Sequence, residues 1–295
     1  MSDDRGYIRI GELSRRVGVS PELLRAWERR YSLLRPSRSP GGFRLYSDAD
    51  VSRVEAMKEA LARGLSAAEA ARRVREGEEE RAGAFERASL LEAGLGELRE
   101  ALRAFDEAGA HAALDRLLAS LSLDAVLRDA VLPLLRELGE SWARGETTVA
   151  QEHFASNLVR GRLLALGRGW GRGSGPQVLL ACPPGELHDL GLIVFGLALR
   201  NRGWRITFLG ADTPISTVRD TAQRLEPDLV VLATLLPSRF ERVLDELLAL
   251  AARWPVAIAG AGATPELAAR CGAECLEEGP YEAAERLARE RGLRR

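Results

Sequence analysis

An alternation of short apolar runs with helical patterns, from Pro176 onward, constrains the fold more than any other feature of the sequence. The apolar runs span 178–181, 205–209, 229–233 and 256–259. The helical patterns span about 187–202, 214–225, 238–253 and 264–271. Strands that alternate with helices of this length indicate a parallel, doubly wound α/β sheet. Because ligands of such sheets bind beyond the carboxyl ends of the strands, we expect a binding site among the loops at 182–188, 210–213, 234–237 and 260–263.

The rest of the chain divides into two helical regions of different character. Residues 1–77 hold short helical stretches punctuated by Gly, Pro and Ser, whereas 85–170 repeat Leu at helical spacing almost without interruption. The second region has room for four helices, which predicts a four-helix bundle. We therefore expect a multidomain chain with units at 1–77, 85–170 and 175–295. The acidic stretch 76–80 and the Gly-rich stretch 167–175 are the expected linkers.

Composition narrows the class of protein. Of the 295 residues, 46% are hydrophobic and 29% are charged, as in a globular protein with a core. No run approaches the roughly 18 apolar residues of a membrane helix, and the first residues lack the basic start and apolar run of a secretory signal. Cys182, Cys271 and Cys275 are odd in number and lack paired metal spacing, which argues against a disulfide scaffold or a zinc site. We expect a cytoplasmic protein with no membrane partner.

The N-terminal region carries a local excess of positive charge. The formal net charge of the chain is −1, but residues 1–77 hold more Lys and Arg than Asp and Glu. Gly18 allows a tight turn after a first short helix, and Ser20 with Pro21 predicts the start of a second, Arg-rich helix. A Gly-Gly turn at 41–42 between basic arms predicts a β-ribbon wing. An Arg-rich helix alone is more often a solvated face, but helix, wing and spacing together predict a winged helix-turn-helix that binds DNA.

This region resembles the MerR family signature. The resemblance rests on L-R-x-W-E-R-R-Y, from Leu24 to Tyr31, and on R-P-x-R-x-x-G-G-x-R-L-Y, from Arg35 to Tyr46. It implies a dimer on a pseudo-palindromic, double-stranded operator. The residues that it implies contact DNA are Arg25, Arg29, Arg30, Tyr31, Arg38, Arg44 and Tyr46. Trp27 is more often a core residue in such a pattern, and Phe43 has the same alternative. Metal-sensing MerR relatives place cysteine ligands in their C-terminal part, and this sequence does not, so we expect another effector.

A histidine motif follows the first strand of the predicted sheet. It reads Glu186-Leu187-His188-Asp189-Leu190-Gly191. Neighbouring carboxylates can orient an imidazole through its other nitrogen, as they do at metal sites, and Gly191 lets a bulky group approach the backbone. Taken alone, E-x-H-x-x-G is more often a histidine that caps a helix.

The motif resembles the D-x-H-x-x-G of Rossmann-like cobalamin-binding domains, with Glu in place of Asp as in light-sensing regulators of the CarH/LitR type. The resemblance implies that His188 is the lower axial ligand of cobalt. It matches Ala233-Thr234-Leu235 to the S-x-L of such domains and Gly260-Ala261-Gly262 to their Gly-rich turn. The family's Ser is Ala233 here, and Thr234 is the candidate for its hydroxyl. The cofactor-binding residues implied in this half are Glu186, His188, Asp189, Gly191, Thr234, Leu235, Gly260 and Gly262.

The helical region resembles the cap that these regulators lay over the upper face of adenosylcobalamin. It carries W-x9-E-H, with Trp142, Glu152 and His153. An indole supplies a flat apolar cover for the adenosyl group, and Glu and His supply an acceptor and a donor for its ribose and base. One position departs from the family, because Ala143 stands where light-responsive relatives commonly have a His that binds cobalt once the cobalt–carbon bond is broken. His153, water, a different upper group or a second chromophore is left for that role.

Together the resemblances imply a regulator of the CarH/LitR cobalamin-dependent photoreceptor family. We expect a repressor without enzymatic activity, a homodimer or homotetramer, that senses adenosylcobalamin and light. Two alternatives stay open. A cobalamin-dependent methyltransferase or mutase subunit fits the sheet but not the winged helix. A MerR-type regulator that senses cobalamin only in the dark, or that lacks cobalamin and uses the sheet for assembly, fits Ala143 and Ala233.

Overall fold

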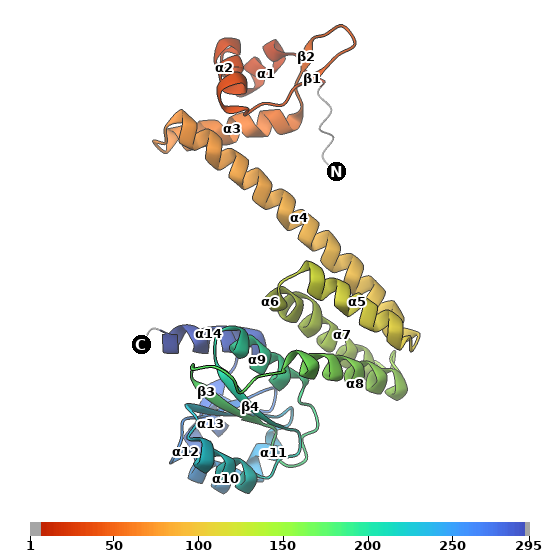
Figure 1. The fold of residues 1–295 in the computed structure, drawn as a ribbon, viewed down its shortest axis with the longest axis vertical. Coiled ribbons are helices and arrows are strands. Elements are labelled where there is room, and N and C mark those ends of the chain that lie inside the picture. The colour runs from red at the N-terminus through yellow and green to blue at the C-terminus, as the bar shows by residue number, and fades with distance from the viewer. Residues whose placement is uncertain (1–6, 293–295) are drawn as a thin grey trace. The chain divides into compact units, whose positions relative to one another are not determined.

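The structure, a computed structural model, describes residues 7–292 (Figure 1). The chain forms two compact units, Met1–Ser89 and Leu90–Arg295.

The first unit contains the predicted helix-turn-helix. Helices α1 (Ile10–Val17) and α2 (Pro21–Tyr31) are joined by a turn in which Gly18 has a φ of +66°. The hydroxyl of Ser20 accepts a hydrogen bond from the backbone N–H of Leu23 at 3.3 Å and so caps α2, as predicted. Helix α3 (Asp48–Ala62) and the first turns of α4 (Ala67–Arg103) complete the unit. Among its buried core residues are Leu13, Leu24, Trp27, Tyr46 and Met57, so the prediction for Trp27 is confirmed.

The predicted wing is a two-stranded hairpin. Strands β1 (Ser37–Arg38) and β2 (Arg44–Leu45) pair antiparallel, with Ser37 opposite Leu45. Gly42 in the turn has a φ of +79°, a backbone conformation that Gly adopts at little cost. Phe43 is 57% exposed at this turn, so the alternative that it lies in the core is wrong.

Helix α4 runs without a break through the acidic stretch at 76–80. Glu is a good helix former, and Gly77 is tolerated within a long helix at a cost of about 1 kcal/mol. Glu78 also accepts a hydrogen bond from Nε of Arg53 in α3 at 2.6 Å. The prediction of a linker at 76–80 is therefore wrong.

The second unit begins with a helical bundle. It contains the end of α4, α5 (Glu107–Ser120), a helix made of α6 (Leu123–Ala125), a π-helical segment (Val126–Val131) and α7 (Leu132–Ala143), and α8 (Val149–Leu166). The π-helical segment ends at Val131, two residues before Pro133, which lacks an N–H and whose ring would clash with the carbonyl four residues earlier in a regular helix. The bundle core is built mainly from Leu and Ala, with Leu98, Leu117, Leu127 and Leu134 among its most buried residues.

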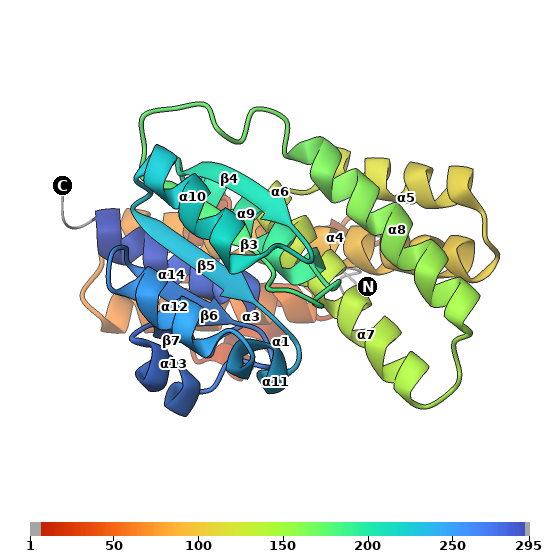
Figure 2. The same cartoon turned by 90° about the horizontal axis from the view of Figure 1, so that it is seen from below.

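The rest of the second unit is the predicted parallel sheet (Figure 2). Its strands lie in the order β4-β3-β5-β6-β7 and are all parallel. They are β3 (Gln177–Ala181), β4 (Arg205–Gly210), β5 (Leu229–Ala233), β6 (Val256–Ala259) and β7 (Glu274–Leu276). The four longer strands were predicted, whereas the edge strand β7 was not, because it is short and contains Glu274.

Helices cover both faces of this sheet. On one face α9 (Leu190–Asn201) and α14 (Pro280–Gly292) share a core with the bundle. The other face carries α10 (Ile215–Leu225), α11 (Pro237–Glu241), α12 (Leu244–Ala251) and α13 (Pro265–Cys271). The sequence pattern predicts one helix at 238–253, where the structure has α11 and α12, and α14 was not predicted. Successive residues of β5 enter opposite cores, as in a doubly wound sheet.

The Gly-rich connection at 167–175 is anchored to the sheet. The backbone N–H of Ile206 in β4 donates to the carbonyl of Trp170 at 2.9 Å. Trp170 is buried and packs edge-on against Phe208, with ring centroids 5.5 Å apart. This stretch therefore connects the bundle to the sheet as predicted, but it lies along the edge strand.

Between Tyr7 and Gly292, no helix combines the length and the apolar character needed to cross a membrane.

Candidate functional site

A cavity of about 940 Å³ lies in the second unit, between the bundle and the carboxyl ends of the sheet strands. Its walls come from α7, the start of α8, the loop after β3, α9 and the ends of β5 and β6. The predicted cofactor residues that line it are Trp142, Glu152, His153, His188, Gly191, Thr234, Leu235 and Gly260. Residues predicted from the helical region and residues predicted from the sheet region therefore meet at one cavity.

His188 lies on the loop between β3 and α9 and is held by Glu186. Nδ1 of the imidazole lies 2.7 Å from Oε1 of Glu186, and the backbone N–H of His188 donates to the same oxygen at 2.8 Å. The side chain of His188 is 64% exposed, whereas that of Glu186 is fully buried. Glu186 therefore lies behind the cavity wall and orients the imidazole.

Glu186 is ionised in this position. Burial opposes its charge, but hydrogen bonds from the backbone N–H groups of Leu235 and His188 and from the hydroxyl of Thr234 outweigh burial and lower its pKa to about 2. Arg239 of α11 also forms an ion pair with it. A carboxylate only accepts hydrogen bonds, so Nδ1 of His188 is the donor, and Nε2 is the ring nitrogen available to a ligand.

Thr234 supplies a hydroxyl at the end of β5, as predicted. Its Oγ1 donates to Oε2 of Glu186 at 2.7 Å, and the N–H of Leu235 donates to the same oxygen at 2.7 Å. Residues at the end of β5 thus hold the carboxylate of Glu186 in place, and this carboxylate orients His188. Replacement of the family's Ser by Ala233 does not leave Glu186 without a hydroxyl donor.

Asp189 does not contact His188 through any hydrogen bond of the structure. It is buried, and its carboxylate is paired with Arg160 of α8, with Nη2 2.6 Å from Oδ2. The expectation that Asp189 faces the cofactor is therefore revised, because this residue connects the bundle to the sheet domain.

The two glycines of the turn after β6 are required by close backbone approach. A Cβ on Gly260, which has a φ of +86°, would lie 2.5 Å from the carbonyl oxygen of Thr234. A Cβ on Gly262 would lie 2.7 Å from the carbonyl carbon of Leu236. Gly262 does not belong to the cavity lining, so its predicted contact with a ligand is replaced by packing against the loop after β5. Gly191, in contrast, lines the cavity and has open space where a Cβ would be.

The bundle supplies the opposite wall. Trp142 near the end of α7 lines the cavity and is 55% exposed. Glu152 in α8 lies 2.7 Å from Nδ1 of His153 and accepts a hydrogen bond from Ser156 at 2.6 Å. Ala143 also lines the cavity and has no donor atom in its side chain.

Many lining residues were not predicted. They include apolar side chains of α7 and α9, namely Leu132, Leu135, Leu138, Leu190, Leu192 and Phe195. The spacing of the α7 residues with Trp142 places them on one helix face, which is a signal that the sequence contains. Arg239 also lines the cavity, and no pattern in its neighbourhood points to it.

The donor set and the cavity fit a cobalamin. The walls are mostly apolar, as a corrin and its substituents require, and the polar groups are few and convergent. An imidazole whose distal nitrogen is held by a buried carboxylate is the arrangement typical of a metal-ligating histidine. His188 is thus the residue that would hold cobalt.

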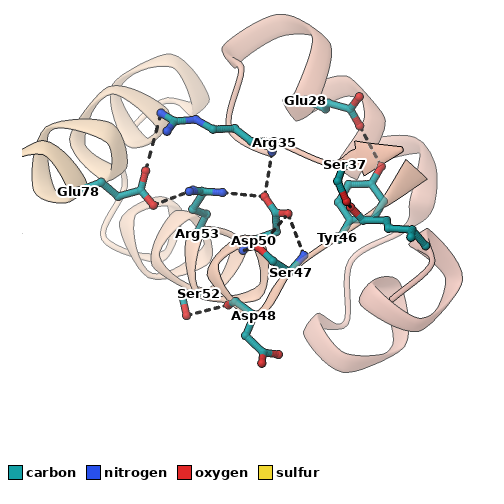
Figure 3. Close-up of polar contacts among 11 residues, drawn as sticks. Glu28, Arg35, Ser37, Tyr46, Ser47, Asp48, Asp50, Ser52, Arg53 and Glu78 are labelled. Atoms are coloured by element: carbon teal, nitrogen blue, oxygen red, sulfur yellow. Dashed lines mark hydrogen bonds and ion pairs between the residues drawn. The ribbon is translucent and has the colours of Figure 1, made fainter. Parts of the chain in front are cut away.

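The first unit presents the predicted basic surface. Arg25, Arg29 and Arg30 of α2 and Arg38 and Arg44 of the wing are all exposed, and Tyr31 is half-buried. Nε of Arg44 donates to Glu28 of α2 at 2.8 Å, which joins the wing to the helix. Tyr46 is fully buried, and its hydroxyl donates to Glu28 at 2.9 Å (Figure 3). We therefore revise the expected role of Tyr46 from contacting DNA to positioning the wing.

A buried polar cluster holds the remaining elements of this unit together (Figure 3). Asp50 of α3 accepts hydrogen bonds from the backbone N–H of Arg35 at 2.9 Å and from Arg53 at 2.8 Å. Arg53 in turn binds Glu78 of α4. The segment that leads into the wing is thus fixed to α3 and α4 through charged hydrogen bonds.

Three segments of the chain match known protein families. Residues 8–76 match the family described as MerR HTH family regulatory protein. Residues 95–166 and residues 176–287 match two families that are both described as B12 binding domain.

Two curated relatives are similar over most of their length. The HTH-type transcriptional repressor CarA of Myxococcus xanthus is 35% identical over 271 residues, which cover 89% of this chain and 89% of CarA. The HTH-type transcriptional repressor CarH of the same organism is 35% identical over 271 residues, which cover 88% of this chain and 90% of CarH. Among solved structures, the monomethylamine corrinoid protein of Methanosarcina barkeri covers 65% of this chain and 96% of its own, with a TM-score of 0.56 and 18% identity. That likeness concerns the fold alone.

Proposed function

The chain belongs to the family of MerR-type transcriptional regulators with B12 binding domains that includes CarA and CarH, and from this premise we propose that it is a repressor whose affinity for operator DNA depends on adenosylcobalamin and light. The observation that carries the proposal is His188. Its Nδ1 is fixed by the ionised Glu186, its Nε2 is left for a metal, and it lines a large apolar cavity.

In this proposal His188 would bind cobalt, and Glu186 and Thr234 keep its ring oriented. Trp142 would cover the adenosyl group, and Glu152 and His153 would supply hydrogen-bonding groups to it. Bound adenosylcobalamin supplies a cobalt–carbon bond that visible light breaks.

The bundle and the sheet contribute opposite walls of the cavity, so the upper group contacts the bundle and the lower ligand comes from the sheet. A ligand shifts a conformational equilibrium only through its different affinity for the two states. The two states differ in the contacts of Trp142 and Glu152 with the adenosyl group, and these contacts are lost when the adenosyl group leaves. A change in the wall of the bundle then alters assembly of the homo-oligomer, and multivalent binding turns a modest change in assembly into a large change in DNA affinity.

In the first unit, α2 enters the major groove and the wing contacts the backbone or minor groove. Arg25, Arg29 and Arg30 contact DNA from the helix, and Arg38 and Arg44 contact it from the wing. These exposed guanidinium groups supply the salt-dependent part of the affinity.

The test uses DNA duplexes selected from a random pool by the wild-type protein loaded with adenosylcobalamin in the dark. The proposal predicts a tight complex in the dark and a loss of binding after green light. A His188→Ala variant should not show the light response. Equal binding of the selected DNA in dark and light, with an unchanged corrinoid spectrum, would leave a regulator that responds to cobalamin only in the dark. Absence of any corrinoid spectrum would leave a regulator that uses the sheet domain for assembly.

A further inference from the structure

Arg239 brings a permanent positive charge to the candidate site from outside every sequence motif. It lies in α11, lines the cavity, and has a side chain that is 17% exposed. Its Nη1 donates to Oε2 of Glu186, whose side chain is fully buried. Because burial of an ion without a countercharge is strongly unfavourable, this ion pair compensates the charge of Glu186.

The two oxygens of Glu186 bind different parts of the site. Oε1 accepts hydrogen bonds from Nδ1 of His188 at 2.7 Å and from the backbone N–H of the same residue at 2.8 Å. Oε2 accepts hydrogen bonds from the hydroxyl of Thr234 and the backbone N–H of Leu235, both at 2.7 Å, and from Arg239. The guanidinium therefore binds the oxygen that does not contact the imidazole.

Arg239 is not needed to hold the carboxylate of Glu186 in position. Without the guanidinium, Oε2 would still accept from Thr234 and Leu235, and Oε1 would still accept from the backbone N–H of His188. These donors are uncharged, whereas hydrogen bonds from a guanidinium are charge-assisted and about twice as strong. The distinct contribution of Arg239 is therefore its charge, which draws the electron density of the carboxylate toward Oε2 and away from Oε1.

We propose that Arg239 is a positioning residue that acts on His188 through Glu186 and limits how strongly the imidazole donates electrons to cobalt. The inference rests on the proposed binding of cobalamin. A carboxylate that accepts a hydrogen bond from Nδ1 raises the basicity of Nε2, the nitrogen that would bind the metal. Because Arg239 draws charge away from the accepting oxygen, this hydrogen bond is weaker than one to a carboxylate without a countercharge. A residue of α11 thus sets the ligand strength of an imidazole on the loop after β3.

The first test needs no cobalamin. The Nδ1–H proton of His188 is observed by nuclear magnetic resonance of the full chain with isotope-labelled histidine, and it is assigned by its loss in His188→Ala. The spectra are recorded at about pH 9, where an ordinary imidazole is uncharged. Arg239→Met removes the charge and keeps most of the apolar length of the side chain. We expect the Nδ1–H signal of this variant to move downfield, because its hydrogen bond to Glu186 becomes stronger.

The second test measures the bond to cobalt. The wild type and Arg239→Met are loaded with cobalamin, reduced to the Co(II) form and compared by electron paramagnetic resonance. A stronger axial nitrogen donor lowers the cobalt hyperfine splitting. The variant should therefore keep the nitrogen hyperfine structure and show a smaller cobalt splitting than the wild type. The reduction potential of the Co(II)/Co(I) couple should become more negative, because a stronger donor favours the higher oxidation state.

Three further variants separate the charge of Arg239 from its packing. Arg239→Gln also removes the charge and should shift both signals in the same direction as Arg239→Met. Arg239→Lys keeps the charge and should lie closer to the wild type. Arg242→Met is the matched control and should behave like the wild type, because Arg242 follows α11 directly, is exposed and does not belong to the cavity lining.

The outcomes separate this inference from the function on which it rests. Unchanged proton and cobalt signals in Arg239→Met, or an upfield shift of the Nδ1–H proton, would overturn the inference. Loss of the nitrogen hyperfine structure would also overturn it, since Arg239 would then hold His188 in place instead of limiting its donation. Failure of both Arg239→Met and Arg239→Gln to fold would contradict it as well, because the fold would then require the charge. If the wild type binds no corrinoid, the proposed function fails and the inference fails with it, even where the Nδ1–H signal shifts as expected.

Discussion

Arg160 in α8 and Asp189 at the start of α9 form an ion pair in which Nη2 lies 2.6 Å from Oδ2 and Nε lies 2.9 Å from Oδ1. The arginine is partly exposed, whereas the aspartate is buried. The pair joins the bundle to the sheet directly beside His188. Both walls of the cavity are therefore positioned by a charged contact as well as by apolar packing.

Removal of this arginine should loosen the two parts of the second unit. In Arg160→Gln the buried carboxylate of Asp189 loses its charged partner, which costs about 1–3 kcal/mol because the arginine of this pair is partly exposed. We expect a comparable fall in the free energy of unfolding, measured with urea, and weaker cobalamin binding. Arg128→Gln is the control, since its pair with Asp129 is exposed and is worth about 0–1 kcal/mol. Equal effects of the two substitutions would contradict this role of Asp189.

The charge of Glu186 should appear in the pH dependence of stability. Its pKa is about 2 in the folded chain and 4.5 as an ordinary glutamate, so the unfolded chain takes up its proton first as pH falls. The stability that comes from this carboxylate is complete above about pH 5 and is lost as pH falls toward 2. Glu186→Gln lacks that contribution. The difference in free energy of unfolding between wild type and variant should therefore shrink between pH 6 and pH 3, and a constant difference would show that Glu186 is not held ionised.

Gly260 should be intolerant of a side chain. An added Cβ would lie 2.5 Å from the carbonyl oxygen of Thr234, and the residue has a φ of +86°. Gly260→Ala should cost about 1–3 kcal/mol of stability and displace Thr234 from Glu186, which should weaken cobalamin binding. Gly161→Ala in α8 has open space for its Cβ and should stabilise the chain by up to about 1 kcal/mol. Thermal unfolding and cobalamin titration of both variants measure these effects, and similar affinities for cobalamin would refute the link to Glu186.

The revised role of Tyr46 separates positioning from DNA contact. Tyr46→Phe loses the hydrogen bond to Glu28 but keeps the buried ring, so it should destabilise the first unit by about 1 kcal/mol. The slope of log affinity for the selected DNA against log salt should stay as in the wild type. Arg38→Gln, on the exposed wing, should instead make that negative slope shallower by about one unit, because one contact with a phosphate is lost. A lowered slope in Tyr46→Phe would return this hydroxyl to the DNA interface.

Much of the fold follows from local pattern. Strands β3, β5 and β6 are almost continuous apolar runs because helices cover both faces of the sheet, and such runs are visible in the sequence. The edge strand β4 also contains Arg205 and Thr207, but its other residues are mainly apolar. Strand β7 has three residues with Glu274 among them, so nothing distinguishes it from a loop until the sheet is assembled. The acidic stretch in α4 has a composition typical of a linker, yet Glu78 is held by Arg53, a contact that becomes visible only with the tertiary structure.

The candidate site, like the fold, is only partly predictable from the sequence. Residue type and spacing identified His188 and Thr234, since a family motif fixes their place in the sequence. Three-dimensional contacts decided what each neighbour does. Asp189 pairs with Arg160, and the buried Tyr46 donates a hydrogen bond to Glu28. Arg239, which lies in a helix without a recognisable motif, pairs with Glu186. Partners that lie far apart in sequence determine these orientations.

The most direct test of the central claim is a titration of wild type and His188→Ala with cobalamin, followed by absorption and by the electron paramagnetic resonance of the Co(II) form. The account predicts nitrogen hyperfine structure from a lower imidazole in the wild type and its loss in His188→Ala, with an affinity lowered by at least the 10- to 100-fold typical of a disturbed ligand shell, taken as an approximate minimum. An unchanged affinity and an unchanged nitrogen signal in His188→Ala would contradict the account.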